Sequence, residues 1–71
     1  MKMVAMRSKI LTEMNEYLKE RSNDYTWGLW IAVFPDEADD DDIDEIATDE
    51  ELWILTVARF AACCRMLGIL K

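Results

Sequence analysis

Residues 48–70 have the sequence TDEELWILTVARFAACCRMLGIL, and this stretch determines how the rest of the chain must be arranged. After the opening TDEE, only Thr56, Arg59 and Arg65 carry polar side chains. A helix that is apolar on nearly all sides must be buried, either by its own chain or by another one. We therefore predict a long apolar C-terminal helix over residues 48–70. Thr48 is its expected N-cap, and the remainder of the chain covers it.

Residues 1–21 are expected to form an amphipathic helix that provides part of this cover. Leu11 and Leu18 are seven residues apart, and Ile10, Met14 and Tyr17 fill the adjoining row. This spacing places the apolar side chains on one face of a helix, with charged residues on the other.

Residues 25–34, YTWGLWIAVF, fit either a short strand or a short helix. Aromatic and β-branched residues favour a strand, and Pro35 would end it. A lone strand, however, leaves its hydrogen-bonding edges open, and no second strand is evident in the chain. A helix would avoid this difficulty and would gain a cap from Asn23 or Asp24, at a cost of about 1 kcal/mol for Gly28. We expect the strand and keep the helix as the alternative.

Residues 36–47 begin an acidic segment, and residues 36–51 hold eleven of the fifteen acids and no cation. Such a block is typical of a solvated loop. Ile43 and Ile46 are spaced three apart, however, so a short helix over residues 40–47 could dock on the core through them. The tract 39–42 has no comparable structural explanation. The expected fold is a single domain over residues 1–71, mostly α, with α+β as the alternative.

Composition limits the classes of partner. The net charge of −7 opposes direct binding to nucleic acid or anionic membranes and favours a basic partner. With 52% hydrophobic residues in 71, the chain has more apolar bulk than a small core hides easily, so we expect a homo-oligomer. Arg59 and Arg65 lie within the apolar run, which argues against a membrane span.

No pattern of catalytic residues is found. The chain has no His, which removes the commonest general base and the commonest zinc ligand. Cys63 and Cys64 are adjacent on a predicted helix, diverge by about 100° and are expected to be reduced core residues of a cytoplasmic protein. Acids occur at several calcium-loop positions, but Glu45 occupies the position that needs glycine. We expect a non-enzymatic protein without a cofactor or a metal.

The acidic segment suggests a specific function. Closely spaced carboxylates on a small rigid body can imitate the phosphate row of a nucleic acid and occupy the basic surface of a protein that binds one. Phage-encoded inhibitors of host nucleases, anti-CRISPR proteins among them, work in this way, and the analogy rests on size and charge alone. We therefore expect an inhibitor of the anti-CRISPR or DNA-mimic type that binds a basic nucleic-acid-binding protein. The predicted contact residues are Asp39, Asp40, Asp41, Asp42, Asp44 and Glu45.

The alternative is a structural adaptor or oligomerisation subunit that binds through its aromatic and apolar surface. Trp27 and Trp30 are its main predicted contacts, together with Trp53 and Phe60. Aromatic anchors are enriched where interfaces are strongest. The two hypotheses differ in whether acids or aromatic residues carry the interface, so salt should weaken the first interface and leave the second unchanged.

Overall fold

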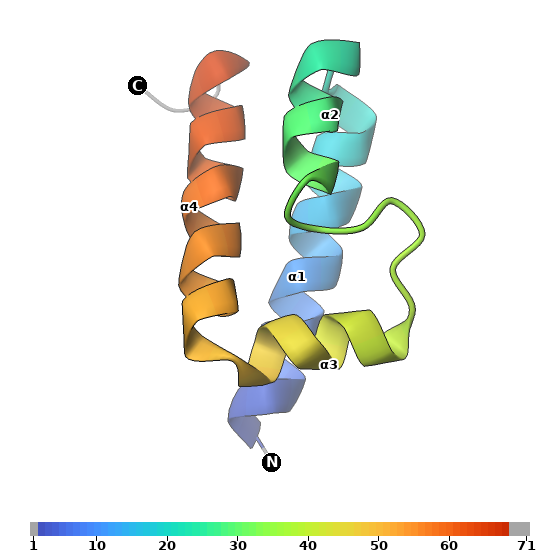
Figure 1. Cartoon of the computed structure of the whole chain (residues 1–71). Coiled ribbons are helices and arrows are strands. Elements are labelled where there is room, and N and C mark those ends of the chain that lie inside the picture. The colour runs from blue at the N-terminus through green and yellow to red at the C-terminus, as the bar shows by residue number, and fades with distance from the viewer. Residues whose placement is uncertain (1, 69–71) are drawn as a thin grey trace.

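The computed structural model describes residues 2–68, which form four helices and no strand (Figure 1). The helices are α1 (Lys2–Arg21), α2 (Asp24–Ile31), α3 (Asp40–Thr48) and α4 (Glu50–Met66). The prediction of a mostly α fold is confirmed, and α1 agrees with the expected N-terminal helix. Met1 and residues 69–71 lie outside the described residues, so the first residue of the predicted first helix and the last two of the predicted last helix are not described.

The helices are arranged so that α3 closes one end of the molecule. Figure 1 shows α1 and α4 running in the same direction, with α2 turning back along α1. A loop over residues 32–39 then leads to α3, which lies crosswise near the start of α4. α3 packs against both α1 and α4, and α2 packs against α4. The acidic segment is therefore carried by one end of a compact helical body.

The core lies where the four helices meet, and Trp30 of α2 is at its centre. Its ring stacks on Phe34 with centroids 5.3 Å apart and meets the edge of Phe60 at 5.9 Å. Its indole N–H donates to Asn15 Oδ1 at 2.9 Å, which satisfies the polar atom of this otherwise apolar side chain. The buried apolar residues come from every helix: Leu11, Met14, Leu18, Trp30, Phe34, Ile46, Ala47, Cys63 and Cys64.

The expectation of a strand over residues 25–34 is wrong, and the helical alternative is correct. Asn23 has an extended backbone and its side chain accepts the N–H of Thr26 at 2.8 Å, the geometry of a helix N-cap. The helix satisfies its backbone groups internally, whereas a strand without a partner leaves them open. The chain leaves α2 through a turn in which Phe34 N–H donates to the carbonyl of Trp30 at 2.9 Å.

The start of the last helix also differs from the expectation. Asp49 is the N-cap of α4, and its side chain accepts the N–H groups of Glu51 and Leu52 at 3.0 and 3.1 Å. Thr48 instead ends α3, where its hydroxyl donates to the carbonyl of Asp44 at 2.8 Å. One residue therefore separates two capped helices, and this tight junction fixes the crosswise direction of α3.

The rest of the chain covers only one side of the C-terminal helix, and the prediction of a long apolar helix over residues 48–70 is not confirmed. The inner side of α4 carries Thr56, Cys63 and Cys64, while Ile54 is 60% exposed and Leu55 is 49% exposed. Thr56 can be buried because its hydroxyl donates to the carbonyl of Leu52 at 2.7 Å. Within residues 2–68, no helix combines the length and the apolar character that crossing a bilayer requires.

Candidate protein-binding surface

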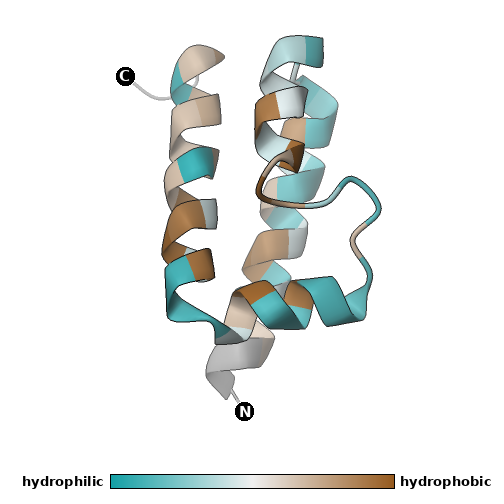
Figure 2. Ribbon diagram, in the orientation of Figure 1, coloured by the Kyte–Doolittle hydropathy of each residue, from teal (hydrophilic) through white to brown (hydrophobic). Residues whose placement is uncertain are grey.

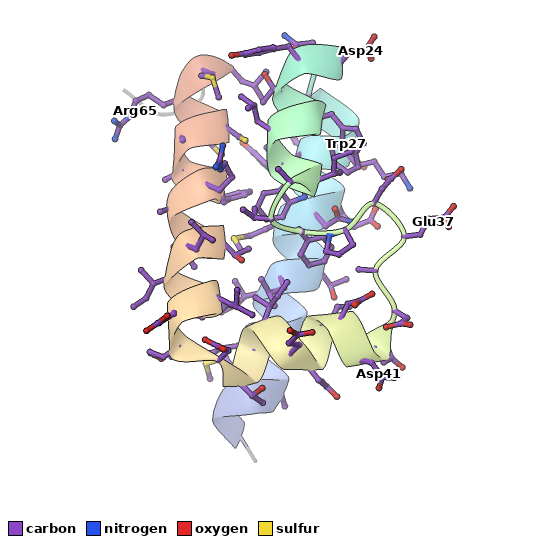
Figure 3. The ribbon with its side chains drawn as sticks, viewed as in Figure 1. Asp24, Trp27, Glu37, Asp41 and Arg65 are labelled. Atoms are coloured by element: carbon purple, nitrogen blue, oxygen red, sulfur yellow. The ribbon has the colours of Figure 1, made fainter. Side chains whose placement is uncertain are left out.

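α3 is amphipathic, and this property places its carboxylates on the outside. Ile46 and Ala47 are buried and Ile43 is partly buried against the core, so the predicted docking through the two isoleucines is confirmed. The opposite side carries the exposed acids, and Asp41 projects from the free end of the helix in Figure 3. Of the predicted contacts, Asp39, Asp40, Asp41, Asp44 and Glu45 are exposed and Asp42 is partly buried.

Asp39 and Asp42 have a structural role that the sequence analysis did not identify. Asp39 is the N-cap of α3, and its side chain accepts the N–H of Asp42 at 3.0 Å. The side chain of Asp42 in turn accepts the N–H of Asp39 at 3.3 Å, which completes a capping box. The carboxylates of the first turn also interact favourably with the positive end of the helix dipole. Part of the acidic tract therefore exists to start α3.

Arg7 of α1 holds the α3–α4 junction in place. Its guanidinium donates to both carboxylate oxygens of Glu50, at 2.9 and 3.0 Å, and lies 4.8 Å from the ring centroid of Trp53. The same group reaches the carbonyl of Ala47 at 3.5 Å. The hydrogen bonds from Arg7 are the main reason that the pKa of Glu50 is lowered, and they outweigh the opposing effect of desolvation. One arginine of α1 thereby contacts both helices of the junction, at residues 40 and 43 positions further along the chain.

The acids of α3 itself have no such cation among the described residues. In the described part of the chain, the salt bridges are Arg7–Glu50 and Arg21–Glu20, and neither includes a carboxylate of α3. Figure 2 shows hydrophilic residues along the outer side of α3 and the loop before it. Neighbouring carboxylates that lack a counter-charge repel one another and create a negative potential, which attracts a cationic partner over a Debye length of about 10 Å at 0.1 M salt.

A hollow of about 190 Å³ lies beside these acids. Val33, Pro35 and Leu52 provide apolar walls, while Asp42 and Glu45 of α3 stand at its edge. Lysine and arginine bury their aliphatic stems on apolar surface and keep the charged end in a polar environment. The hollow therefore offers both parts of what a long basic side chain needs.

The two predicted tryptophan contacts do not join this surface. Trp30 is 0% exposed in the core, so its side chain has no surface to offer a partner. Trp27 is partly buried and borders a separate depression of about 220 Å³ with Lys19 and Asp24. In Figure 3 the ring of Trp27 lies beside α2, away from Asp41 on α3. The aromatic and acidic predictions thus concern different parts of the molecule.

The two cysteines and the residues with calcium-loop spacing lie in positions that do not favour catalysis or metal binding. Both cysteines are free thiols in the core, as predicted, and burial raises their pKa values. The thiol of Cys63 donates to the carbonyl of Thr26 at 3.8 Å. The residues with partial calcium-loop spacing lie on α3 and its junction with α4, and within residues 2–68 no three metal-ligating side chains come together. Reactive thiols usually need exposure and a lowered pKa.

No protein-family model, curated protein or solved structure matches the chain in comparisons with known proteins.

Proposed function

We propose that the protein is a non-enzymatic acidic binding module of the cytoplasm, and that the outer face of α3 engages the basic, nucleic-acid-binding surface of another protein. In this proposal it acts as an inhibitor of the anti-CRISPR or DNA-mimic type. The observation that carries the proposal is the combination of exposed α3 carboxylates that pair with no cation among the described residues and the adjacent hollow lined by Asp42 and Glu45. A solubilising loop would need neither a fixed helix nor such a hollow.

The density of charge along α3 supports mimicry of a phosphate row. Five carboxylates fall between residues 40 and 45. At a rise of about 1.5 Å per residue this segment extends over roughly 7.5 Å, or about one charge per 1.5 Å. Duplex DNA carries about one charge per 1.7 Å along its axis. A basic surface that accepts a short length of nucleic acid would therefore meet a comparable charge on α3.

The fixed position of α3 supports the same conclusion. The capping box, the junction at Asp49 and the anchor from Arg7 hold the helix on the body before any partner binds. A preorganised surface loses less conformational entropy on association than a flexible acidic tail does. The carboxylates can therefore contribute to both the rate and the affinity of binding.

The test begins with capture of partners from a lysate of the source cell on the immobilised protein, eluted with a salt gradient. The captured protein is then purified, and its affinity for this chain is measured at several salt concentrations. We expect binding to weaken steeply with salt and to be competed by duplex DNA. A partner that binds the chain and DNA simultaneously, or that is indifferent to salt, would contradict the proposal.

A matched pair of variants tests the role of α3 without removing its cap. The triple variant Asp41→Asn, Asp44→Asn and Glu45→Gln should lose roughly tenfold to a hundredfold in affinity, because each lost charge removes an interaction with a cation. The control variant Glu13→Gln, Glu16→Gln and Glu20→Gln changes the net charge equally on α1. It should bind nearly as well as the original chain. Equal losses in both variants would show that only total charge matters.

The adaptor alternative receives less support. Trp30 is in the core, and Trp27, Trp53 and Phe60 pack against that core. These residues therefore stabilise the fold and are not primarily available to a partner. Substitution Trp30→Ala is expected to unfold the domain and cannot separate the two hypotheses. The large aromatic side chain that is well exposed within the described residues is Tyr25, at 71%.

A further inference from the structure

The outer side of α4 is an exposed apolar face, which we name the α4 outer face. Ile54 is 60% exposed, and Leu55 and Met66 are each 49% exposed. Ala58 and Ala62 lie between them and are exposed as well. In Figure 1, α4 forms one flank of the molecule, and Figure 2 shows hydrophobic residues on this flank. Small residues in the middle of the face let another helix approach closely.

The α4 outer face is self-complementary when a second α4 helix lies antiparallel to it. Ile54 and Ala62 lie four residues before and after Ala58, and Glu51 and Arg65 lie seven residues before and after it. In an antiparallel pair of α4 helices crossing at Ala58, the bulky Ile54 of each chain would meet the small Ala62 of the other. Glu51 of each chain would meet Arg65 of the other. A two-fold interface requires this kind of self-complementarity.

Both charged residues are available for that contact. Glu51 and Arg65 are exposed, and neither belongs to a salt bridge among the described residues. Figure 3 shows Arg65 projecting away from the body near the end of α4. The partner in this contact therefore has to supply an anion beside Arg65 and a cation beside Glu51, with apolar surface between them.

We propose that the α4 outer face binds a second copy of this chain in an antiparallel, two-fold symmetric dimer centred on Ala58. The antiparallel arrangement separates the two acidic α3 helices, because each lies near the N-terminal end of its own α4. It also aligns the helix dipoles favourably. The inference is independent of the proposed function, since α3 remains exposed in the dimer.

The dimer should be weak and should respond to salt in its own way. A single helix face is a small interface, so we expect a dissociation constant in about the micromolar range. Each chain carries a net charge of −7, so added salt screens the repulsion between the two bodies as well as the attraction of the Glu51–Arg65 pairs, and the dimer should depend on salt much less than the complex proposed for α3 does. Salt should weaken the complex proposed for α3, so the two interactions are distinguishable.

The first experiment measures the molar mass of the original chain by analytical ultracentrifugation from about 0.1 μM to about 100 μM, a range that brackets micromolar affinity. Ala58→Glu places two like charges at the symmetry axis and should weaken the dimer by about a hundredfold or more. Ala5→Glu makes the same substitution at an exposed position of α1 and should leave the dimer intact. A chain that stays monomeric throughout, or a dimer that survives Ala58→Glu, would overturn the proposal.

A charge-reversal experiment tests the antiparallel register. Glu51→Arg and Arg65→Glu should each weaken self-association about tenfold, because each creates like-charge pairs across the interface. Mixed together, the two variants should form a heterodimer as tight as the original dimer, since both of its cross-chain contacts pair Arg with Glu. Circular dichroism melts establish that each variant is folded. Folded variants that fail to associate when mixed would exclude this register. Single variants that self-associate as tightly as the original chain would also exclude it, because a parallel dimer pairs each of these positions with itself and has like charges there before and after either change.

Discussion

α3 and α4 show opposite relations between composition and environment. α3 lies in the most acidic part of the chain, yet Ile46 and Ala47 are buried in the core. α4 contains the most apolar run, yet Ile54 is 60% exposed. The comparison shows that spacing is more informative than average polarity. Two apolar side chains on the correct face secured α3 to the core, whereas α4 has more apolar positions than one side of a helix can bury.

The largest expected effect comes from making the same substitution in both helices. Ile46→Ala removes a side chain that is 5% exposed and should lower the free energy of unfolding by about 2–4 kcal/mol through lost burial and a cavity. Ile54→Ala changes a side chain that is 60% exposed and should alter the unfolding free energy of the monomer by less than about 0.5 kcal/mol. Urea unfolding at low protein concentration measures both. Similar losses in the two variants would mean that Ile54 is buried in the monomer.

The parts of the fold that sequence could predict are those governed by local spacing. The heptad spacing of Leu11 and Leu18 predicted α1, and both residues are buried. The spacing of Ile43 and Ile46 predicted α3. In each case the apolar residues form one narrow stripe, so only one helix face can turn inward.

Other features depended on the rest of the molecule and could not be deduced locally. The composition of residues 25–34 suits a strand. The segment forms a helix instead, because Asn23 caps that helix and because no partner strand is present among the described residues. On α4, Thr56 and Cys63 are buried, and the thiol of Cys63 contacts α2 through its hydrogen bond to the carbonyl of Thr26. Hydropathy alone gives no reason to choose them over Ile54.

The candidate surface likewise has some features that local spacing predicts and others that depend on residues distant in sequence. The exposure of Asp41, Asp44 and Glu45 followed from the helix period once α3 was docked. The anchor from Arg7 to Glu50 spans 43 residues and leaves no local pattern in the sequence. The capping box between Asp39 and Asp42 had a local signal, an acid three residues after a potential cap, but the surrounding acids concealed it.

A smaller effect should distinguish capping acids from exposed acids within α3. Asp39→Ala removes the N-cap and should lower the free energy of unfolding by about 1 kcal/mol. Asp41→Ala removes an exposed carboxylate whose interaction with the helix dipole is opposed by repulsion from its neighbours, so its effect should stay within about 0.5 kcal/mol. Thermal or urea unfolding near neutral pH measures the pair. An equal loss in both variants would indicate that general charge, and not capping, starts α3.

The smallest expected effect concerns the anchor between α1 and the α3–α4 junction, and it depends on pH. The pKa of Glu50 is lowered in the folded state by its hydrogen bonds with Arg7, so the ionised carboxylate stabilises the fold above the unfolded-state pKa, near 4.5. This contribution is lost as pH falls through the lower folded-state pKa. Glu50→Gln should therefore be less stable than the original chain at pH 7, and the difference should disappear toward pH 3.

The matched control is Glu51→Gln on the next residue, whose side chain makes no described hydrogen bond and which should show a smaller pH dependence. Because Glu50 is exposed, solvent screens its pairing with Arg7, and the stability difference is expected to be modest and to shrink at high salt. Urea unfolding of the three chains between pH 3 and pH 7 measures it. If Glu50→Gln and Glu51→Gln followed the same pH curve, the hydrogen bonds from Arg7 would not stabilise the junction, and the fixed orientation of α3 would have to come from Asp49 and the buried side of α3 alone.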